Sequence, residues 1–202
     1  MEFVSTTTTS PFLVNRVLGS LVMNHHKRIL ILLAAVVRIL ATLLLATSAL
    51  LSSFDSSAEV VIGESWLKSL LRWDVFQFLH IAEKGYVFEY EWAFFPGLPL
   101  LLRFSMNLIR YWLPNSSSEK LLLVMGAVGT VLVDGTLTLY DLTEHVFHSH
   151  SFAFLAALLS LLPSSPATLR LAPYTEPFFT YLSYKGVFLV HVSQSSVSKT
   201  LV

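Results

Sequence analysis

The sequence predicts an all-α, multi-pass membrane protein, and three observations favour that fold class. Of the 202 residues, 54% are hydrophobic and only 13% are charged, about half the charged share of a typical soluble domain. The mean hydropathy is +0.66. Several apolar segments are also long enough to cross a hydrocarbon core of ~30 Å. The chain therefore carries too little charged surface for an ordinary soluble domain.

Charge and cysteine content exclude several classes of function. Thirteen Lys and Arg residues balance thirteen Asp and Glu residues, so no net positive charge points to nucleic acid as a partner. The chain has no cysteine, which excludes disulfides, thiolate metal ligands and a cysteine nucleophile. Any chemistry has to use carboxylate, histidine, arginine or hydroxyl groups.

The N-terminal part predicts a disordered segment followed by a membrane anchor. Residues 1–28 open with a Ser/Thr-rich run without periodicity, and we expect them to be disordered and cytosolic. Residues 29–51 are apolar and longer than the ~7–15-residue apolar core of a signal peptide, so they are predicted to be a retained span. Arg16, Lys27 and Arg28 precede this span, and the positive-inside rule then places the N-terminus in the cytosol.

Residues 52–92 are predicted to form a large first lumenal loop. Trp66, Leu67 and Leu70 recur in it at helical spacing, which indicates a helix lying in the membrane interface. Residues 93–113 then predict a second span, returning to the cytosol. On this topology Asn115, which opens an N-glycosylation acceptor sequence with Ser116 and Ser117, faces the cytosol and stays unmodified.

The C-terminal half predicts one regular span and a broken element. Residues 121–142 form the third predicted span, interrupted at Asp134-Gly135. Four prolines within a short stretch then predict a broken or re-entrant element over 152–172, which membranes tolerate where it is buried in protein or lines a cavity. A last span over 177–192 and a polar tail over 193–202 complete the predicted membrane domain of residues 29–192.

Asp74 is the strongest candidate for a catalytic residue. It follows Arg72 and Trp73 in an aromatic-rich stretch just outside a predicted span. A lone carboxylate in a partly dehydrated pocket can act as a general base toward a sugar hydroxyl. The alternative is that Asp74 simply caps the N-terminus of the following helix.

Other polar residues are interpreted more conservatively. Glu83, Glu89 and Glu91 are expected to be solvated loop charges, and His80 a structural histidine. We also expect the polar loop that follows the third span to be solvated and without a metal, because no partner motif accompanies its three histidines. They are His145, His148 and His150.

Three charged residues fall inside apolar segments. Arg38 and Asp134 each carry an insertion cost of about 2.5–3.5 kcal/mol at a membrane centre, so both should face the protein interior or a water-filled cavity. They either neutralise one another or belong to a site, and the sequence leaves both possibilities open. The same argument applies to Glu176, which lies beside Tyr174 in the proline-broken segment.

An ordered block of residues resembles a known family. The block runs Trp73-Asp74, Phe78, Ile81-Ala82-Glu83, Gly85-Tyr86, Glu89, Ala93-Phe94-Phe95-Pro96-Gly97 and Pro99. Arg38-Ile39-Leu40, Ser165-Pro166-Ala167 and Tyr174-Thr175-Glu176 support it. This pattern is similar to the second mannosyltransferase of glycosylphosphatidylinositol (GPI) anchor synthesis, the PIG-V family, and the resemblance covers roughly residues 29–186.

The resemblance implies a fold, an activity and a location. The fold would be the N-terminal part of a GT-C membrane glycosyltransferase in the endoplasmic reticulum. The enzyme would transfer the second mannose, in α-1,6 linkage, from dolichol-phosphate-mannose to the mannosyl-glucosaminyl-phosphatidylinositol precursor on the lumenal side. The expected partners are thus the donor lipid, the GPI precursor glycolipid and the membrane lipids; a small partner subunit is left open. No cofactor or metal is expected.

The resemblance also assigns roles to residues. Asp74 maps onto the family's presumed catalytic aspartate in the first lumenal loop, where it would accept the proton of the acceptor hydroxyl as the anomeric centre inverts. The residues nominated for substrate binding are Arg38, Arg72, Trp73, Glu83, Phe94, Phe95, Tyr174 and Glu176. Members of the family continue through further spans, so we expect this chain to be a truncated form. Two alternatives remain: a non-catalytic membrane protein of the same family, and a transporter fragment.

Overall fold

The computed structural model describes residues 11–51, 57–63, 65–162 and 170–200, and its regular elements in these ranges are all helical. This confirms the all-α prediction. In chain order, the elements are α1 (Pro11–Ser48), α2 (Ser57–Ile62), η1 (Trp66–Ser69), α3 (Val75–Lys84), η2 (Glu89–Ala93), α4 (Gly97–Arg110), α5 (Ser118–Leu132), α6 (Thr136–Phe147), α7 (His150–Leu161) and α8 (Thr175–Thr200).

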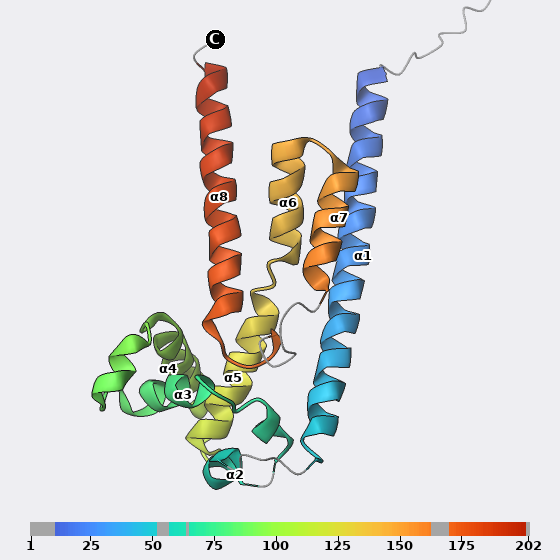
Figure 1. Ribbon diagram of the computed structural model, residues 1–202. Helices are drawn as coiled ribbons and strands as arrows, with labels where there is room; N and C mark the ends of the chain where they lie inside the picture. Colours follow the sequence, from blue (N-terminus) through green and yellow to red (C-terminus); the bar gives the residue numbers. More distant parts are fainter. Residues whose placement is uncertain (1–10, 52–56, 64, 163–169, 201–202) are drawn as a thin grey trace, which may run out of the picture.

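The helices form a long bundle with a cluster of short helices at one end. Helices α1, α6, α7 and α8 run roughly alongside one another, and α5 continues the line of α6 toward the short helices (Figure 1). Helices α2, α3 and α4 gather where α1 ends and α5 begins (Figure 1). We call this the α2–α4 end. The opposite end carries the start of α1 and the connection between α6 and α7.

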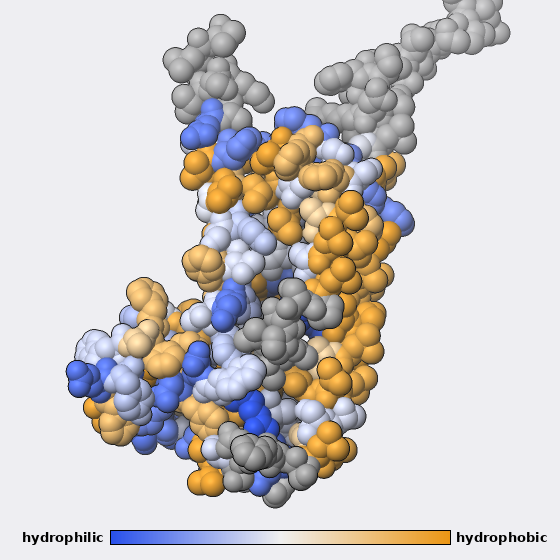
Figure 2. Space-filling model, in the orientation of Figure 1, coloured by the Kyte–Doolittle hydropathy of each residue, from blue (hydrophilic) through white to orange (hydrophobic). Residues whose placement is uncertain are grey.

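Two segments among the described residues are long and apolar enough to cross a membrane. They are Gly19–Ser48 in α1 and Ser118–Phe147, which consists of α5 and α6. Ile31, Leu32 and Leu44 of α1 are more than half exposed, and Figure 2 shows apolar side chains along this helix. Exposed leucine and isoleucine in such numbers suit lipid rather than water. The chain is therefore a membrane protein.

The ends of the chain differ from the sequence prediction. Residues 11–28 are the first turns of α1 rather than disordered, because proline suits the first position of a helix and apolar residues continue beyond it. Residues 1–10 lie outside the described residues. At the other end, α8 runs to Thr200, so most of the predicted polar tail is helical.

The predicted second span is not confirmed as a membrane crossing. Helix α4 has 14 residues, about 21 Å at 1.5 Å per residue, which is too short for a ~30 Å core. It is amphipathic: Leu98, Leu102 and Met106 are buried against α3 and α5. The turn that follows α4 consequently lies at the α2–α4 end, whereas the sequence analysis placed it on the opposite side.

The later helices contain two interruptions. Helix α5 ends at Leu132 and α6 begins at Thr136, so the break falls at the Asp134-Gly135 pair that interrupts the apolar pattern. Helix α7 has 12 residues and packs against α6 and α1. Residues 163–169 of the predicted broken element lie outside the described residues. The chain then turns through residues 170–174 into α8.

Two apolar clusters hold these elements together. The larger joins the end of α1, helices α2 to α5 and the segment 171–174; Leu71, Leu122 and Ala172 are among its fully buried members. The smaller joins α1, α6 and α7 around Leu30 and Tyr140. The segment that leads into α8 is thus packed directly onto the helices that carry Asp74.

Candidate active site

Asp74 lies at the first turn of α3 but does not cap it. The residue occupies the N-cap position, yet its side chain makes no capping hydrogen bond. Helix capping therefore does not explain why a carboxylate stands at this position. Trp73, immediately before it, has a φ of 48°. A non-glycine residue in this left-handed region costs on the order of 1–3 kcal/mol and is found most often where function requires it. The backbone strain therefore sits directly beside the candidate base.

Asp74 lines a large cavity at the α2–α4 end. The cavity has a volume of about 720 Å³. Phe94 and Phe95 form part of its aromatic wall, and Thr175 and Glu176 from the start of α8 form another part. Two carboxylates thus share a largely apolar cavity, an arrangement suited to holding a sugar whose hydroxyls need polar partners.

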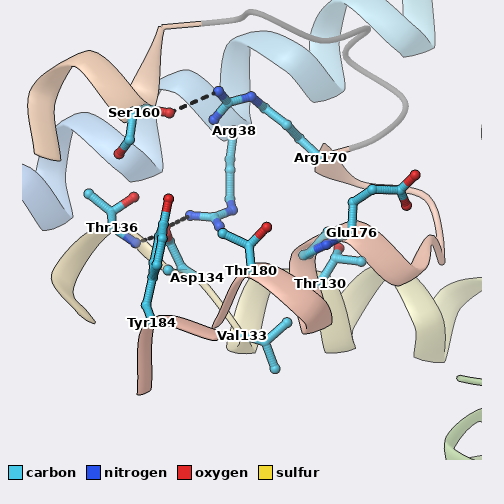
Figure 3. Close-up of a pocket in the computed structure, with 12 residues that line it drawn as sticks. Arg38, Thr130, Val133, Asp134, Thr136, Ser160, Arg170, Glu176, Thr180 and Tyr184 are labelled. Carbon is cyan, nitrogen blue, oxygen red and sulfur yellow. Dashed lines mark hydrogen bonds and ion pairs between the residues drawn. The ribbon is translucent and has the colours of Figure 1, made fainter. Parts of the chain in front are cut away.

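A second, more polar cavity of about 360 Å³ lies between α1, the α5–α6 break, α7 and the start of α8. Figure 3 shows the side chains of Arg38, Asp134 and Arg170 gathered in it. A guanidinium nitrogen of Arg38 lies 2.6 Å from an Asp134 carboxylate oxygen. The other Asp134 oxygen accepts the backbone N–H of Thr136 at 2.8 Å. Arg38 and Asp134 therefore form an ion pair and also line a cavity. The sequence had left open whether they neutralise one another or belong to a site, and the structure is compatible with both.

Arg170 brings a second guanidinium into this cavity. It donates to the carbonyl oxygens of Ser160 at 3.2 Å and Leu162 at 3.0 Å, which are neutral partners. The Nε–H groups of Arg38 and Arg170 are both buried without a hydrogen-bond acceptor among the described residues. A buried donor without a partner costs about 1–3 kcal/mol, so both guanidinium groups have hydrogen-bonding capacity that the described residues do not use.

Glu176 connects the two cavities. It lines the Asp74 cavity and also the Arg38–Arg170 cavity. Tyr174, two residues earlier, is buried and donates its hydroxyl to the Arg72 carbonyl oxygen at 3.2 Å. Burial, together with the negative charges of Asp74 and Glu176, raises the pKa of Tyr174 to about 12. Tyr174 therefore remains a neutral donor, and its hydrogen bond to Arg72 holds the start of α8 against the segment that leads into α3.

Glu91 contradicts the prediction of a solvated charge. Its side chain is fully buried, and one of its oxygens accepts the N–H groups of Val87 at 2.7 Å and Phe88 at 2.9 Å. The other oxygen is bonded to Nδ1 of His80. Burial alone would raise the pKa of Glu91, but the hydrogen bonds from Phe88, His80 and Val87 outweigh it and lower the pKa. Glu91 and His80 thus hold the loop that precedes the aromatic wall.

The structure brings together part of the predicted site. Asp74, Phe94, Phe95 and Glu176 share one cavity, with Tyr174 beside it, and Arg38 lies in the adjoining cavity. Three other nominated residues are not among those that line either cavity: Arg72 and Trp73, which neighbour Asp74, and Glu83. The backbone carbonyl of Glu83 instead accepts from Arg103 at 3.1 Å.

Sequence reasoning missed several residues of the polar cavity, chiefly Arg170, Thr180 and Tyr184. Arg170 had a detectable signal, because it is a charge in the same proline-broken segment as Glu176. Thr180 and Tyr184 had none, since they depend on how α8 faces the α5–α6 break. Among the described residues, no group of three or more His, Asp or Glu side chains is placed to hold a metal ion.

Comparison with known proteins places the chain in a family. The sequence model of a mannosyltransferase family, described as "Mannosyltransferase (PIG-V)", matches residues 21–202. The chain belongs to the PIG-V mannosyltransferase family. The matched range contains Asp74, the residues that line both cavities and every described helix except the first ten residues of α1. No solved structure matches the chain.

Individual members of the PIG-V family show the same relationship. GPI mannosyltransferase 2 of Cryptococcus neoformans is 35% identical over 155 residues, which cover 74% of this chain and 35% of that protein. GPI alpha-1,6-mannosyltransferase 2 of Rattus norvegicus is 41% identical over 127 residues, covering 61% of this chain and 25% of that protein. The Homo sapiens protein of the same name is 38% identical over 127 residues. The chain thus spans about a quarter to a third of the length of these relatives.

Proposed function

We propose that this chain takes part in GPI-anchor synthesis as a mannosyltransferase that adds the second mannose, in α-1,6 linkage. The donor would be dolichol-phosphate-mannose and the acceptor the mannosyl-glucosaminyl-phosphatidylinositol intermediate. Membership of the PIG-V family and the names of the relatives support this assignment. The observation that carries it is the Asp74 carboxylate, which leaves its helix uncapped and lines a cavity large enough for sugars.

Asp74 acts as the general base in the proposed reaction. Its carboxylate accepts the proton of the acceptor 6-hydroxyl as that oxygen attacks the anomeric carbon of the donor mannose. The bond between this carbon and the phosphate oxygen breaks, and dolichyl phosphate leaves from the opposite face with inversion. Phe94 and Phe95 offer apolar faces for a sugar ring, and Glu176 accepts hydrogen bonds from sugar hydroxyls.

The leaving phosphate needs positive charge, and the Arg38–Arg170 cavity supplies it. Among the described residues, neither guanidinium group has an acceptor for its buried Nε–H, and arginine suits phosphate because its guanidinium is planar and always charged. Glu176 lies in the wall common to the two cavities. A phosphate at the arginines would therefore leave its mannose directed past Glu176 toward Asp74. In this account Arg170 replaces Arg72 as the second cationic residue.

The proposed setting is a GT-C-type fold in the endoplasmic reticulum membrane, with the N-terminus in the cytosol and the α2–α4 end in the lumen. Arg16, Lys27 and Arg28 near the start of the first span favour this orientation. Residues 49–117 connect the two candidate spans, and loops longer than about 60 residues cross the membrane largely regardless of their charge. No cofactor is needed for the proposed chemistry, because the phosphate is already a good leaving group.

Complementation of cells that lack GPI mannosyltransferase 2 tests this function. The 202-residue chain, its Asp74→Asn variant and an Asp141→Asn control would be expressed at equal abundance, with GPI-anchored protein at the cell surface as the readout. Asp141 pairs with Lys27 of α1 and lines neither cavity, so the control changes the same functional group away from the site. We expect the chain and the control to restore anchors and Asp74→Asn to fail. If none of the three restores them, the chain is the non-catalytic member of the family.

A further inference from the structure

The turn between α4 and α5 carries an N-glycosylation acceptor sequence on an exposed surface. Asn115 is followed by Ser116 and Ser117, and all residues from 111 to 117 are exposed. An Asn-X-Ser/Thr sequence is modified only on the lumenal side of the membrane and only where the asparagine is accessible. The position of this turn in the fold therefore decides what happens to Asn115.

The structure places Asn115 at the same end of the molecule as Asp74. Helix α4 is too short to carry the chain across a bilayer, and it packs against α3 and α5, so the chain returns to the α2–α4 end before α5 begins (Figure 1). In the orientation proposed above, on which this inference rests, that end is lumenal. Asn115 is therefore expected on the lumenal side of the membrane, whereas the sequence analysis placed it in the cytosol.

Asn115 also stands clear of the membrane core. The candidate span Ser118–Phe147 has 30 residues, about 45 Å of helix against a hydrocarbon core of ~30 Å. Glu119 and Lys120 lie in the first turn of α5, and Leu122 and Leu123 are fully buried in the same cluster as residues of α3 and α4. The first turns of α5 thus belong to the body formed by the short helices. Asn115 precedes them in a turn whose residues are all exposed.

We propose that Asn115 carries an N-linked glycan. The side-chain amide nitrogen would lose a proton and bond to the anomeric carbon of an oligosaccharide, while the bond from that carbon to a lipid diphosphate donor breaks and the diphosphate leaves. The glycan would occupy the water-facing side of the α2–α4 end, outside the cavity that contains Asp74. Neither cavity is lined by residues of this turn.

The test compares two acceptor positions at opposite ends of the bundle. The natural chain, Asn115→Gln, and Asn115→Gln combined with Ser149→Asn would be expressed in cells with a lumenal glycosylation system. Each would be run on a gel before and after endoglycosidase treatment of the membranes. Ser149→Asn creates an acceptor sequence with His150 and Ser151 between α6 and α7. Ser149 is the N-cap of α7 and accepts the Phe152 N–H at 3.4 Å, a role that asparagine fills equally well.

The proposal predicts an endoglycosidase-sensitive band for the natural chain and none for either variant. If only the chain that combines Asn115→Gln with Ser149→Asn is glycosylated, the orientation in the membrane is inverted. That result would overturn both this inference and the proposed lumenal site. If none of the chains is modified although each is present in the membrane, Asn115 is not a glycosylation site. The mannosyltransferase proposal would then still depend on complementation, which is scored separately.

Discussion

A single methyl group added at Gly126 should disrupt the packing that positions the site. A Cβ at this buried α5 residue would lie 2.2 Å from Cβ and 2.9 Å from Cγ of Pro173, and 3.1 Å from a methyl carbon of Leu102. Contacts this short force a shift, and a fully buried proline ring has no flexible end that can yield. Overpacking of a core costs typically 1–3 kcal/mol. Because Pro173 lies beside Tyr174 and Glu176, the shift should also displace the wall common to both cavities.

Gly186→Ala is the matched control, because it makes the same change in α8 with no atom within 4 Å of the new Cβ. Replacing a helical glycine by alanine favours the helix by roughly 0.8–1 kcal/mol. In detergent micelles, far-UV circular dichroism on heating should give a lower Tm for Gly126→Ala than for the natural chain. The Tm of Gly186→Ala should be equal or higher. A cost of 1–3 kcal/mol corresponds to roughly 2–12 °C for a chain of this size. Equal Tm values for the two variants would refute the proposed packing of the 170–174 segment onto α5.

Two further predictions concern buried charges. Arg38→Met should lower the free energy of unfolding by leaving Asp134 unpaired, by less than the ~3–5 kcal/mol seen for fully buried pairs, since the two side chains keep 21% and 25% of their exposure. Chemical unfolding in detergent would measure this, and addition of Asp134→Leu should recover much of the loss; an unchanged midpoint for Arg38→Met would count against the pair. For Glu91, the pKa in the folded chain is lowered, so its ionised form stabilises the fold above the ordinary Glu pKa of about 4.3. That stability is lost as the pH falls through the lowered value. The Tm of the natural chain should therefore drop more steeply on acidification than that of Glu91→Gln, and parallel curves would contradict this.

The sequence contained enough information for the fold class and for part of the site. Composition and apolar runs indicate membrane helices, and the cost of charge in a membrane identified Arg38, Asp134 and Glu176. Apolar content alone could not predict whether α4 crosses the membrane, because an amphipathic helix packed on other helices and a short span have similar compositions. Glu91 was misjudged for a related reason: its burial depends on the fold of its loop around His80, which local sequence does not specify. Arg170 could have been found by extending the intramembrane-charge argument by a few residues.

The central claim is that the Asp74 carboxylate carries the transfer of mannose. Its most direct test is a transfer assay in membranes that contain the chain, with labelled dolichol-phosphate-mannose and the mannosyl-glucosaminyl-phosphatidylinositol acceptor. The account predicts labelled product from the natural chain and from Asp141→Asn, and a loss of at least about 100-fold for Asp74→Asn, the lower end of what a general base contributes. Transfer by Asp74→Asn at the rate of the natural chain, or no transfer by any of the three proteins at equal abundance, would contradict it.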